Sequence, residues 1–244
     1  MDKANYKTAW KALTRAAELA PNNAIYLSAA GEVALIKGRH DKAIEYLEKA
    51  LANNLKSFGP DHPDIAKNWS HLGETWREKG KHDKAMEYFE KALASDLKTF
   101  GPEHPKVARD WSNIGTAWHN KGQYDKAIEY YEKALTSDLK TRGSEHPSVA
   151  INWSELGLAW MYKRKYDKAI EYFEKALASD LKTYGPDYPS VALRWTNLGS
   201  AWANKGEYGK AREYYNKALA VFQKTGMKNH ARQVENYIRA LPRG

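Results

Sequence analysis

The sequence predicts an all-α solenoid of five helix pairs, with one extra helix at each end. The motif WSNIGTAW, from Trp111 to Trp118, recurs at intervals of 42 residues. Its echoes begin at Leu27, Trp69, Trp153 and Trp195. Residues 66–107 and 108–149 are identical at 26 of 42 positions. A repeat this regular is typical of solenoids, in which each unit buries its apolar face against its neighbours.

The first helix of each pair, helix A, is predicted by the spacing of its apolar residues. Each repeat has positions 1 to 42, counted from Ala24, Ala66, Ala108, Ala150 and Ala192. Positions 1, 4, 7, 8 and 11 hold Ala, Trp, Leu or Ile, Gly and Trp in all but the degenerate first repeat, which is a helical spacing. In the third repeat we expect helix A over 106–120. Glycine at position 8 predicts a close helix crossing, and the two tryptophans are expected in the core rather than as base-stacking platforms.

The second helix, helix B, is predicted by a stripe at positions 17, 20, 21, 24, 27, 28 and 32. In the third repeat this stripe begins at Tyr124, and Gly143 follows the helix. The turn to the next repeat reads GPDHP, GPEHP, GSEHP and GPDYP, from Gly59, Gly101, Gly143 and Gly185. Its second proline suits the first turn of the next helix A. Arg164 stands where other repeats have glycine at position 15. If the turn is kept, Arg164 must adopt a positive φ at a cost of about 1 kcal/mol; otherwise this turn differs from the others.

The expected organisation is one array over residues 1–244. Its parts are a half-repeat helix over 1–23, repeats over 24–65, 66–107, 108–149, 150–191 and 192–227, and a capping helix and tail over 228–244. Tyr6, Ala9, Leu13 and Ala16 match helix B positions with no helix A before them. This favours a piece of a longer array over a cap. After Gly226, a basic helix over 229–240 has the polar character that a C-terminal cap requires.

Composition limits the functional classes. The chain has no cysteine, which excludes disulfides and thiolate chemistry and favours a reducing, cytoplasmic location. Mean hydropathy is −0.78, and no apolar run is long enough to span a bilayer, so no membrane partner is expected. The net charge of +9 divides into +2 over residues 1–23, zero over 24–191 and +7 over 192–244. A nucleic-acid groove would spread its charge along the binding face, so this distribution makes nucleic acid an unfavoured partner.

The pattern W-x-x-[LI]-G-x-x-W, followed by [YH]-x-x-A-x-x-x-[FYL]-x-x-A, resembles the tetratricopeptide repeat (TPR) over nearly the whole chain. The resemblance implies a right-handed superhelix. This repeat is eight residues longer than the usual 34, and HPxVA enters helix A, as in the repeats of kinesin light chains and related bacterial proteins. The resemblance implies a non-enzymatic scaffold that binds a peptide or partner protein in its concave groove.

No residue pattern indicates a catalytic, cofactor or metal site. His62, His104 and His146 share one turn position, which favours a role in the turn over metal ligation. His71 and His119 lack a third ligand at fixed spacing. The serines of position 5 repeat with the fold and have no consistent basic partner, and the glycines form no phosphate-binding loop.

The resemblance places positions 2, 5, 6, 9, 12 and 13 of helix A on the inner face of the groove. The candidate groove residues are Lys67, His71, Arg77, Arg109, Asn113, Thr116, Asn120, Glu155, Tyr162, Asn197 and Asn204. These positions vary between repeats while the scaffold does not, which indicates either a modular binding surface or drift on a solvated face.

Two features of the groove sharpen the expectation. Asn113 and Asn197 match the asparagine of kinesin light chain repeats that holds a peptide backbone, whereas His71 and Glu155 do not. The lysine and asparagine of the chaperone-tail carboxylate clamp are absent, so chaperone C-termini are not expected ligands. Lys67, Arg77 and Arg109 favour an acidic peptide side chain between the second and third repeats.

Two other functions stay open. The first helix lacks a preceding partner and could support end-to-end self-association. The basic C-terminal end could bind an acidic surface or nucleic acid; its cations are Lys210, Arg212, Lys217, Lys224, Lys228 and Arg232.

Overall fold

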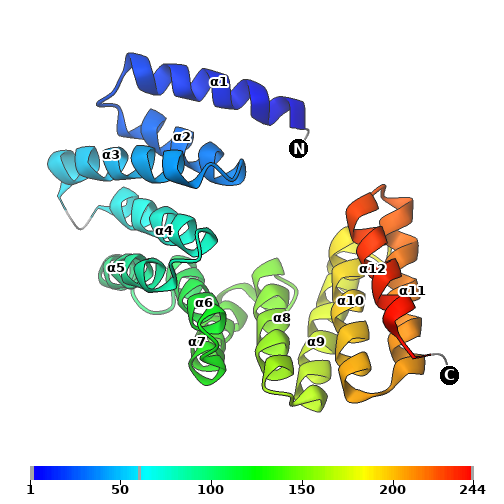
Figure 1. Cartoon of the computed structure of the whole chain (residues 1–244). Coiled ribbons are helices and arrows are strands. Elements are labelled where there is room, and N and C mark those ends of the chain that lie inside the picture. The colour runs from blue at the N-terminus through cyan, green and yellow to red at the C-terminus, as the bar shows by residue number, and fades with distance from the viewer. Residues whose placement is uncertain (1–2, 60–61, 243–244) are drawn as a thin grey trace. The chain divides into compact units, whose positions relative to one another are not determined.

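The computed structural model describes residues 3–59 and 62–242, with side chains from residue 10 onward, and every regular element in this part is an α-helix (Figure 1). The helices are α1 (Lys3–Leu19), α2 (Ala24–Ile36), α3 (His40–Phe58), α4 (Pro63–Glu78), α5 (His82–Phe100), α6 (Pro105–Asn120), α7 (Tyr124–Arg142), α8 (Pro147–Tyr162), α9 (Tyr166–Tyr184), α10 (Pro189–Lys205), α11 (Tyr208–Lys224) and α12 (Lys228–Ala240). The side chains of Tyr6 and Ala9, the Pro60–Asp61 step and the Arg243–Gly244 end lie outside the described residues.

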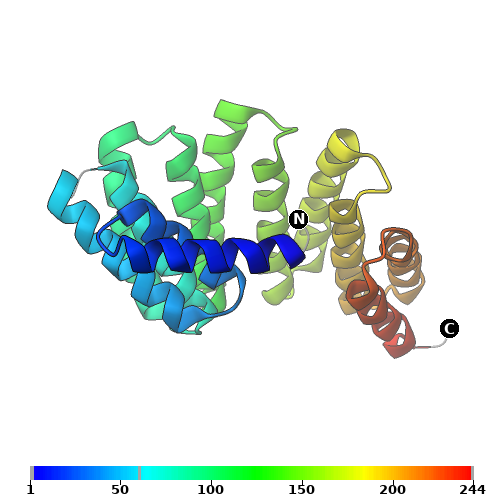
Figure 2. The ribbon, with the colours of Figure 1, turned by 90° about the horizontal axis from the view of Figure 1, so that it is seen from above.

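The helices form two compact units, which divide between α6 and α7. In the first unit α2 pairs with α3 and α4 with α5, while α1 packs on α2, α3 on α4 and α5 on α6. In the second unit α8 pairs with α9 and α10 with α11, while α7 packs on α8 and α12 on α11 (Figures 1 and 2). This arrangement confirms the predicted solenoid of helix pairs, and the bounds of α6, α7 and α12 agree with the predicted ones to within a residue.

Glycine at position 8 lets the large side chain at position 24 of helix B lie against helix A. A Cβ atom on Gly73 would lie 2.5 Å from the ring of Phe89, and one on Gly157 would lie 2.5 Å from the ring of Phe173. Gly199 has the same relation to Tyr215, at 2.6 Å. The close crossing was predicted, but the partner of the glycine is a buried side chain rather than the facing backbone.

The turn between helix A and helix B depends on a left-handed residue at position 15. Gly38, Gly80 and Gly206 have φ values of 67°, 71° and 91°. Arg164 has φ 59° and is the one non-glycine residue with a positive φ in the described part of the chain. The turn is therefore kept, and Arg164 has the positive φ expected in that case, which a residue other than glycine rarely adopts. The Arg164 Nε donates to the Tyr166 hydroxyl at 3.4 Å.

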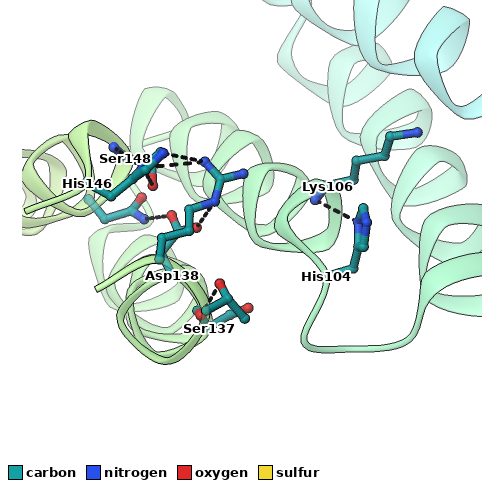
Figure 3. A network of polar contacts seen from close by, with 9 residues as sticks. His104, Lys106, Ser137, Asp138, His146 and Ser148 are labelled. Carbon is teal, nitrogen blue, oxygen red and sulfur yellow. Dashed lines mark hydrogen bonds and ion pairs between the residues drawn. The ribbon is translucent and has the colours of Figure 1, made fainter. Parts of the chain in front are cut away.

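The turn between repeats is closed by a histidine that caps helix A. The Nδ1 atom of His104 accepts a hydrogen bond from the Lys106 backbone N–H at 3.2 Å, and its ring stacks on Phe100 with centroids 4.3 Å apart (Figure 3). His62 and His146 cap α4 and α8 in the same way, and a proline begins each of these helices. The predicted role of these histidines in the turn is confirmed. In α10 the substitute Tyr188 provides no such cap and stacks on Tyr184.

The tryptophans lie in the seams between helices rather than in the centre of the core. Each is only half-buried, so the prediction of core residues was partly wrong. Trp202 shows why: Lys205 Nζ lies 5.1 Å and Lys210 Nζ 4.1 Å from its ring centroid. Lys205 also pairs with Asp167 at 2.5 Å, and Lys79 with Asp41 and Lys121 with Asp83 repeat this link between successive repeats. The lysines cover the aromatic faces that base stacking would need.

The end helices pack on their neighbours through aromatic side chains. In α1, Trp10 meets Tyr46 edge-on at 6.4 Å and lies 4.9 Å from the Arg39 guanidinium. In α12, Val234 is buried and Tyr237 packs on Tyr215 at 5.5 Å.

Candidate functional site

The predicted inner-face positions of the first unit lie on α2, α4 and α6; α4 contacts both α2 and α6. Lys67 Nζ lies 2.8 Å from the carboxylate of Glu32, and His71 Nδ1 lies 3.4 Å from the same carboxylate oxygen. Burial lowers the pKa of His71 despite the nearby Glu32, so its ring is neutral near pH 7. Burial also raises the pKa of Glu74, against the influence of Arg77 and Arg109. Charges of both signs therefore crowd into one partly desolvated surface.

Arg109 and Asn113 lie one turn apart on α6. The Arg109 side chain is 48% exposed, and its guanidinium lies 3.9 Å from Asp96 and 3.6 Å from Asp110. The Nδ2 atom of Asn113 is buried and has no hydrogen-bond partner among the described residues. If the side chain turns toward a ligand carbonyl oxygen, this amide donor gives up no hydrogen bond within the protein.

A hollow of about 390 Å³ lies at the start of the same surface, between α2 and α4. The lining includes the exposed side chain of Ile25 and the polar side chains Ser28, Glu32, Asn54, Lys67 and Asn68. It combines one apolar wall with groups that can donate and accept hydrogen bonds, as small binding sites commonly do.

A polar pair joins helix B of one repeat to helix A of the next, at positions 31 and 3. Asn54 pairs with Asn68, whose amide also meets the Ser28 hydroxyl at 3.0 Å. Asp138 accepts a hydrogen bond from Asn152 Nδ2 at 3.0 Å and lies 3.4 Å from Arg142 Nε (Figure 3). Asp180 pairs with Arg194 at 2.9 Å.

The remaining pair consists of two acids, Asp96 and Asp110, whose side chains are 1% and 0% exposed. Ser70 donates to Asp110 Oδ1 at 3.3 Å. Burial, with the adjacent Asp96 acting against Arg109, raises the pKa of Asp110 to about 7. A proton on one of the two carboxyl groups removes the repulsion between two buried negative charges.

Sequence reasoning did not single out these pairs. A signal was present, because position 31 lies three and four residues after positions 28 and 27 of the apolar stripe in helix B. An acid at that spacing faces the core. Its partner at position 3 lies outside the predicted helix A stripe and gave no comparable signal.

The other predicted groove residues of the first unit do not gather around Arg109 and Asn113. Arg77 pairs with its neighbour Glu78 at 2.5 Å, near the end of α4. Thr116 donates to the Ser112 carbonyl of its own helix at 3.0 Å, and Asn120 is exposed at the end of α6.

In the second unit the predicted residues have intramolecular partners. Glu155 accepts from the Tyr131 hydroxyl at 3.4 Å, and Asn197 Nδ2 donates to Ser154 Oγ at 3.1 Å. Asn204 donates to the Ser200 carbonyl at 2.8 Å. Tyr162 is 55% exposed and stacks on Tyr124 with centroids 5.3 Å apart. Asn197, unlike Asn113, would have to exchange a bond in order to bind a peptide.

The basic C-terminal end is partly neutralised within the second unit. Lys224 pairs with Asp187 and Lys217 with Glu213, both at 2.6 Å. Lys210 lies over the Trp202 ring, and Arg212 donates to the Pro242 carbonyl at 3.3 Å. These contacts leave fewer cations for an external anion than the formal charge suggests.

Among residues 3–59 and 62–242, no cluster of three or more histidines and acids could hold a metal ion. No helix in that part is long and apolar enough to cross a membrane.

Comparison with solved structures shows the same fold in several proteins. BtubC (BKLC) from P. vanneervenii superposes with a TM-score of 0.74 at 22% identity, covering 91% of this chain and 90% of that one. A variant of the nearly identical TPR-like kinesin light chain repeats of Podosopora anserina gives 0.72 at 26% identity, with coverages of 85% and 98%. The Rap conjugation gene regulator of plasmid pLS20, in complex with the Phr* peptide, gives 0.73 at 19% identity, with coverages of 90% and 58%.

A comparison with curated protein sequences finds no match. The family model of the tetratricopeptide repeat matches four overlapping segments, residues 22–98, 67–140, 111–178 and 148–224. The chain therefore belongs to the tetratricopeptide repeat family.

Proposed function

We propose that the chain is a non-enzymatic scaffold that binds an extended peptide segment of a partner protein. The inner face of α4 and α6 would hold it. Asn113 would bind the peptide backbone, and Arg109, with Lys67, would bind an acidic side chain. The observation that carries the proposal is the buried and unpartnered Nδ2 atom of Asn113, one turn from a half-exposed arginine.

The physical argument is that the amide donor of Asn113 lacks a hydrogen-bond partner. A buried donor without a partner costs folding free energy, and a ligand carbonyl at that point recovers it. A guanidinium binds a carboxylate through two parallel hydrogen bonds, which gives both strength and orientation. The hollow beside Ile25 would take an apolar side chain of the same peptide.

The comparisons support this class of function. The Rap regulator of plasmid pLS20 has the same fold and was solved with a bound peptide. Tetratricopeptide proteins generally bind peptide or protein partners. The other predicted groove residues would contribute weaker contacts, because their polar atoms are exposed or already bonded; they are Arg77, Thr116, Asn120, Glu155, Tyr162, Asn197 and Asn204.

The two rival functions have less support. Trp10 packs against Tyr46 and Arg39 within the chain, which leaves less of α1 for end-to-end self-association. Nucleic-acid binding needs several unpaired cations along one track, and Lys217 and Lys224 are already paired.

A random peptide library displayed against the wild-type chain tests the proposal. We expect enriched peptides with an acidic residue, whose binding falls at least about tenfold in Asn113→Ala and in Arg109→Gln. Lys91→Gln is the matched control, since it removes one positive charge from the solvated Glu87–Lys91 pair on α5. Enrichment of the same peptides by all three variants would contradict the proposal.

A further inference from the structure

The Asp96–Asp110 pair lies directly behind the arginine of the proposed peptide site. Arg109 is the cation within 4 Å of both carboxyl groups in the described part of the chain. The same guanidinium is 48% exposed on the inner face. One arginine therefore connects a buried acid pair with the surface where a ligand would bind.

We propose that Asp96 and Asp110 act as a proton-dependent counter-ion for Arg109, so that an acidic peptide side chain binds at Arg109 together with the uptake of a proton. This inference rests on the proposed function, because it concerns the same site and adds the regulation of its affinity by pH.

The charge balance carries the argument. With both aspartates ionised, two negative charges face the single positive charge of Arg109, and a third carboxylate would be repelled. With one proton shared between the aspartates, the pair and Arg109 are neutral together. A bound peptide carboxylate then pairs with the Arg109 guanidinium in place of the aspartates. This favours protonation of the acid pair. By thermodynamic linkage, if the bound carboxylate raises the affinity of the acid pair for a proton, the proton raises the affinity of the site for the carboxylate by the same factor.

No neighbouring group that the structure describes supplies a second positive charge that could balance the acid pair in place of the proton. From α4, Ser70 donates one hydrogen bond to Asp110 but carries no charge. Burial lowers the pKa of His71, also on α4, and raises the pKa of Glu74, which Arg109 opposes. From α5 the facing acid is Asp96 itself, and from α6 the facing cation is Arg109.

The other repeats show that the acid pair is not required by the fold. At the same two positions, Asp138 has an amide partner in Asn152, and Asp180 has a cation in Arg194. Asn54 and Asn68 pair without charge. The variant Asp110→Asn therefore copies the Asp138–Asn152 arrangement that the chain already uses, and it places an amide beside Asp96 without a group that titrates.

The experiment uses a histidine-free peptide with one glutamate, selected on the wild-type chain, and its Glu→Gln version. Affinity is measured by calorimetry from pH 6 to pH 8, in buffers of different ionisation enthalpy. For the glutamate peptide and wild type we expect affinity to fall with rising pH, by up to about tenfold per unit above pH 7, with net proton uptake on binding. The Asp110→Asn variant is expected to bind without proton uptake and with a flat profile. The glutamine peptide should give a flat profile with both proteins.

His71→Gln is the control for the other titratable group, and it should keep the wild-type slope. Binding that is lost in Arg109→Gln but is independent of pH in wild type overturns the linkage alone. An unchanged slope in Asp110→Asn, or a lost slope in His71→Gln, also overturns it. Failure of any peptide to bind at pH 6 overturns the proposed function and the linkage together, so the two failures are distinguishable.

Discussion

Asn152 donates a hydrogen bond to Asp138 at 3.0 Å, from the position that Asp110 occupies one repeat earlier. At position 3 the two pairs differ by one side-chain atom, and their cations differ as well: Arg109 lies near Asp110, whereas Arg142 lies near Asp138. Asp138 has a hydrogen-bond donor in Asn152 at every pH, whereas the Asp96–Asp110 pair needs a proton to supply a donor. The contributions of the two pairs to the stability of the fold therefore respond differently to pH.

The first prediction concerns that response. Folding raises the pKa of Asp110 from 3.8 to about 7. Between these values the folded state holds a proton that the unfolded chain has lost, so stability falls as pH rises. The slope is about 1.4 kcal/mol per pH unit for one proton, and it levels off above about pH 7. Urea unfolding at pH 5, 6, 7 and 8 should show this term in wild type and not in Asp110→Asn.

The reverse substitution is the control. Asn152→Asp should place a second acid beside Asp138 and introduce a loss of stability with rising pH in the second unit. Arg142, 3.4 Å from Asp138, should make that loss smaller than in the first unit. Identical pH profiles for wild type and Asp110→Asn would contradict the assignment of the proton to this pair.

The second prediction concerns the glycine at position 8. In Gly73→Ala the new Cβ would lie 2.5 Å from the ring of Phe89, which is only 1% exposed and cannot move aside easily. We expect a loss of about 1–3 kcal/mol in the free energy of unfolding. Gly209→Ala is the matched control, because Gly209 is helical and has nothing within 4 Å of its Cβ position. That substitution should stabilise by up to about 1 kcal/mol. Equal effects at the two sites would show that the Phe89 contact does not limit the residue at position 73.

The 42-residue period explains why so much of the fold could be predicted from the sequence. Five aligned copies separate the helical stripes from the turns, and this fixes the helix bounds, the capping histidines and the left-handed Arg164. The period says little about which helix B residue meets which residue of the next helix A, because that depends on the crossing angle between helices. Asp96 and Asp110 were missed for this reason.

The candidate site was predictable in part. Its positions follow from the family pattern, but the state of each side chain does not. Asn113 and Asn197 share one repeat position, yet only Asn197 has its amide engaged, by Ser154. The half-burial of the tryptophans was also missed, since lysines from the next turn cover rings that the sequence pattern assigns to the core.

The third prediction concerns the cap at the turn between repeats. His104→Ala removes both the hydrogen bond to the Lys106 N–H and the stack on Phe100, and should cost about 1 kcal/mol. Tyr188 occupies this position before α10 and makes no cap bond. Tyr188→His should keep a ring stacked on Tyr184 and add the missing cap, with a gain of similar size. Thermal unfolding of both variants checks the pair, and a loss of stability in Tyr188→His would show that the histidine does not act through the cap.

The last prediction concerns Arg164, at φ 59°. Arg164→Gly relieves the left-handed strain, and the exposed bond that it gives up, to the Tyr166 hydroxyl, is long at 3.4 Å. Since exposed hydrogen bonds add little net stability, we expect a gain of about 1 kcal/mol, or about 2–4 °C in Tm for a chain of this size. Gly80→Arg makes the reverse change at φ 71°, in a turn with nothing within 4 Å of the Cβ position, and should cost a similar amount. If Arg164→Gly instead lowers Tm, the side chain stabilises the turn by more than its conformation costs, and the strain argument fails at this position.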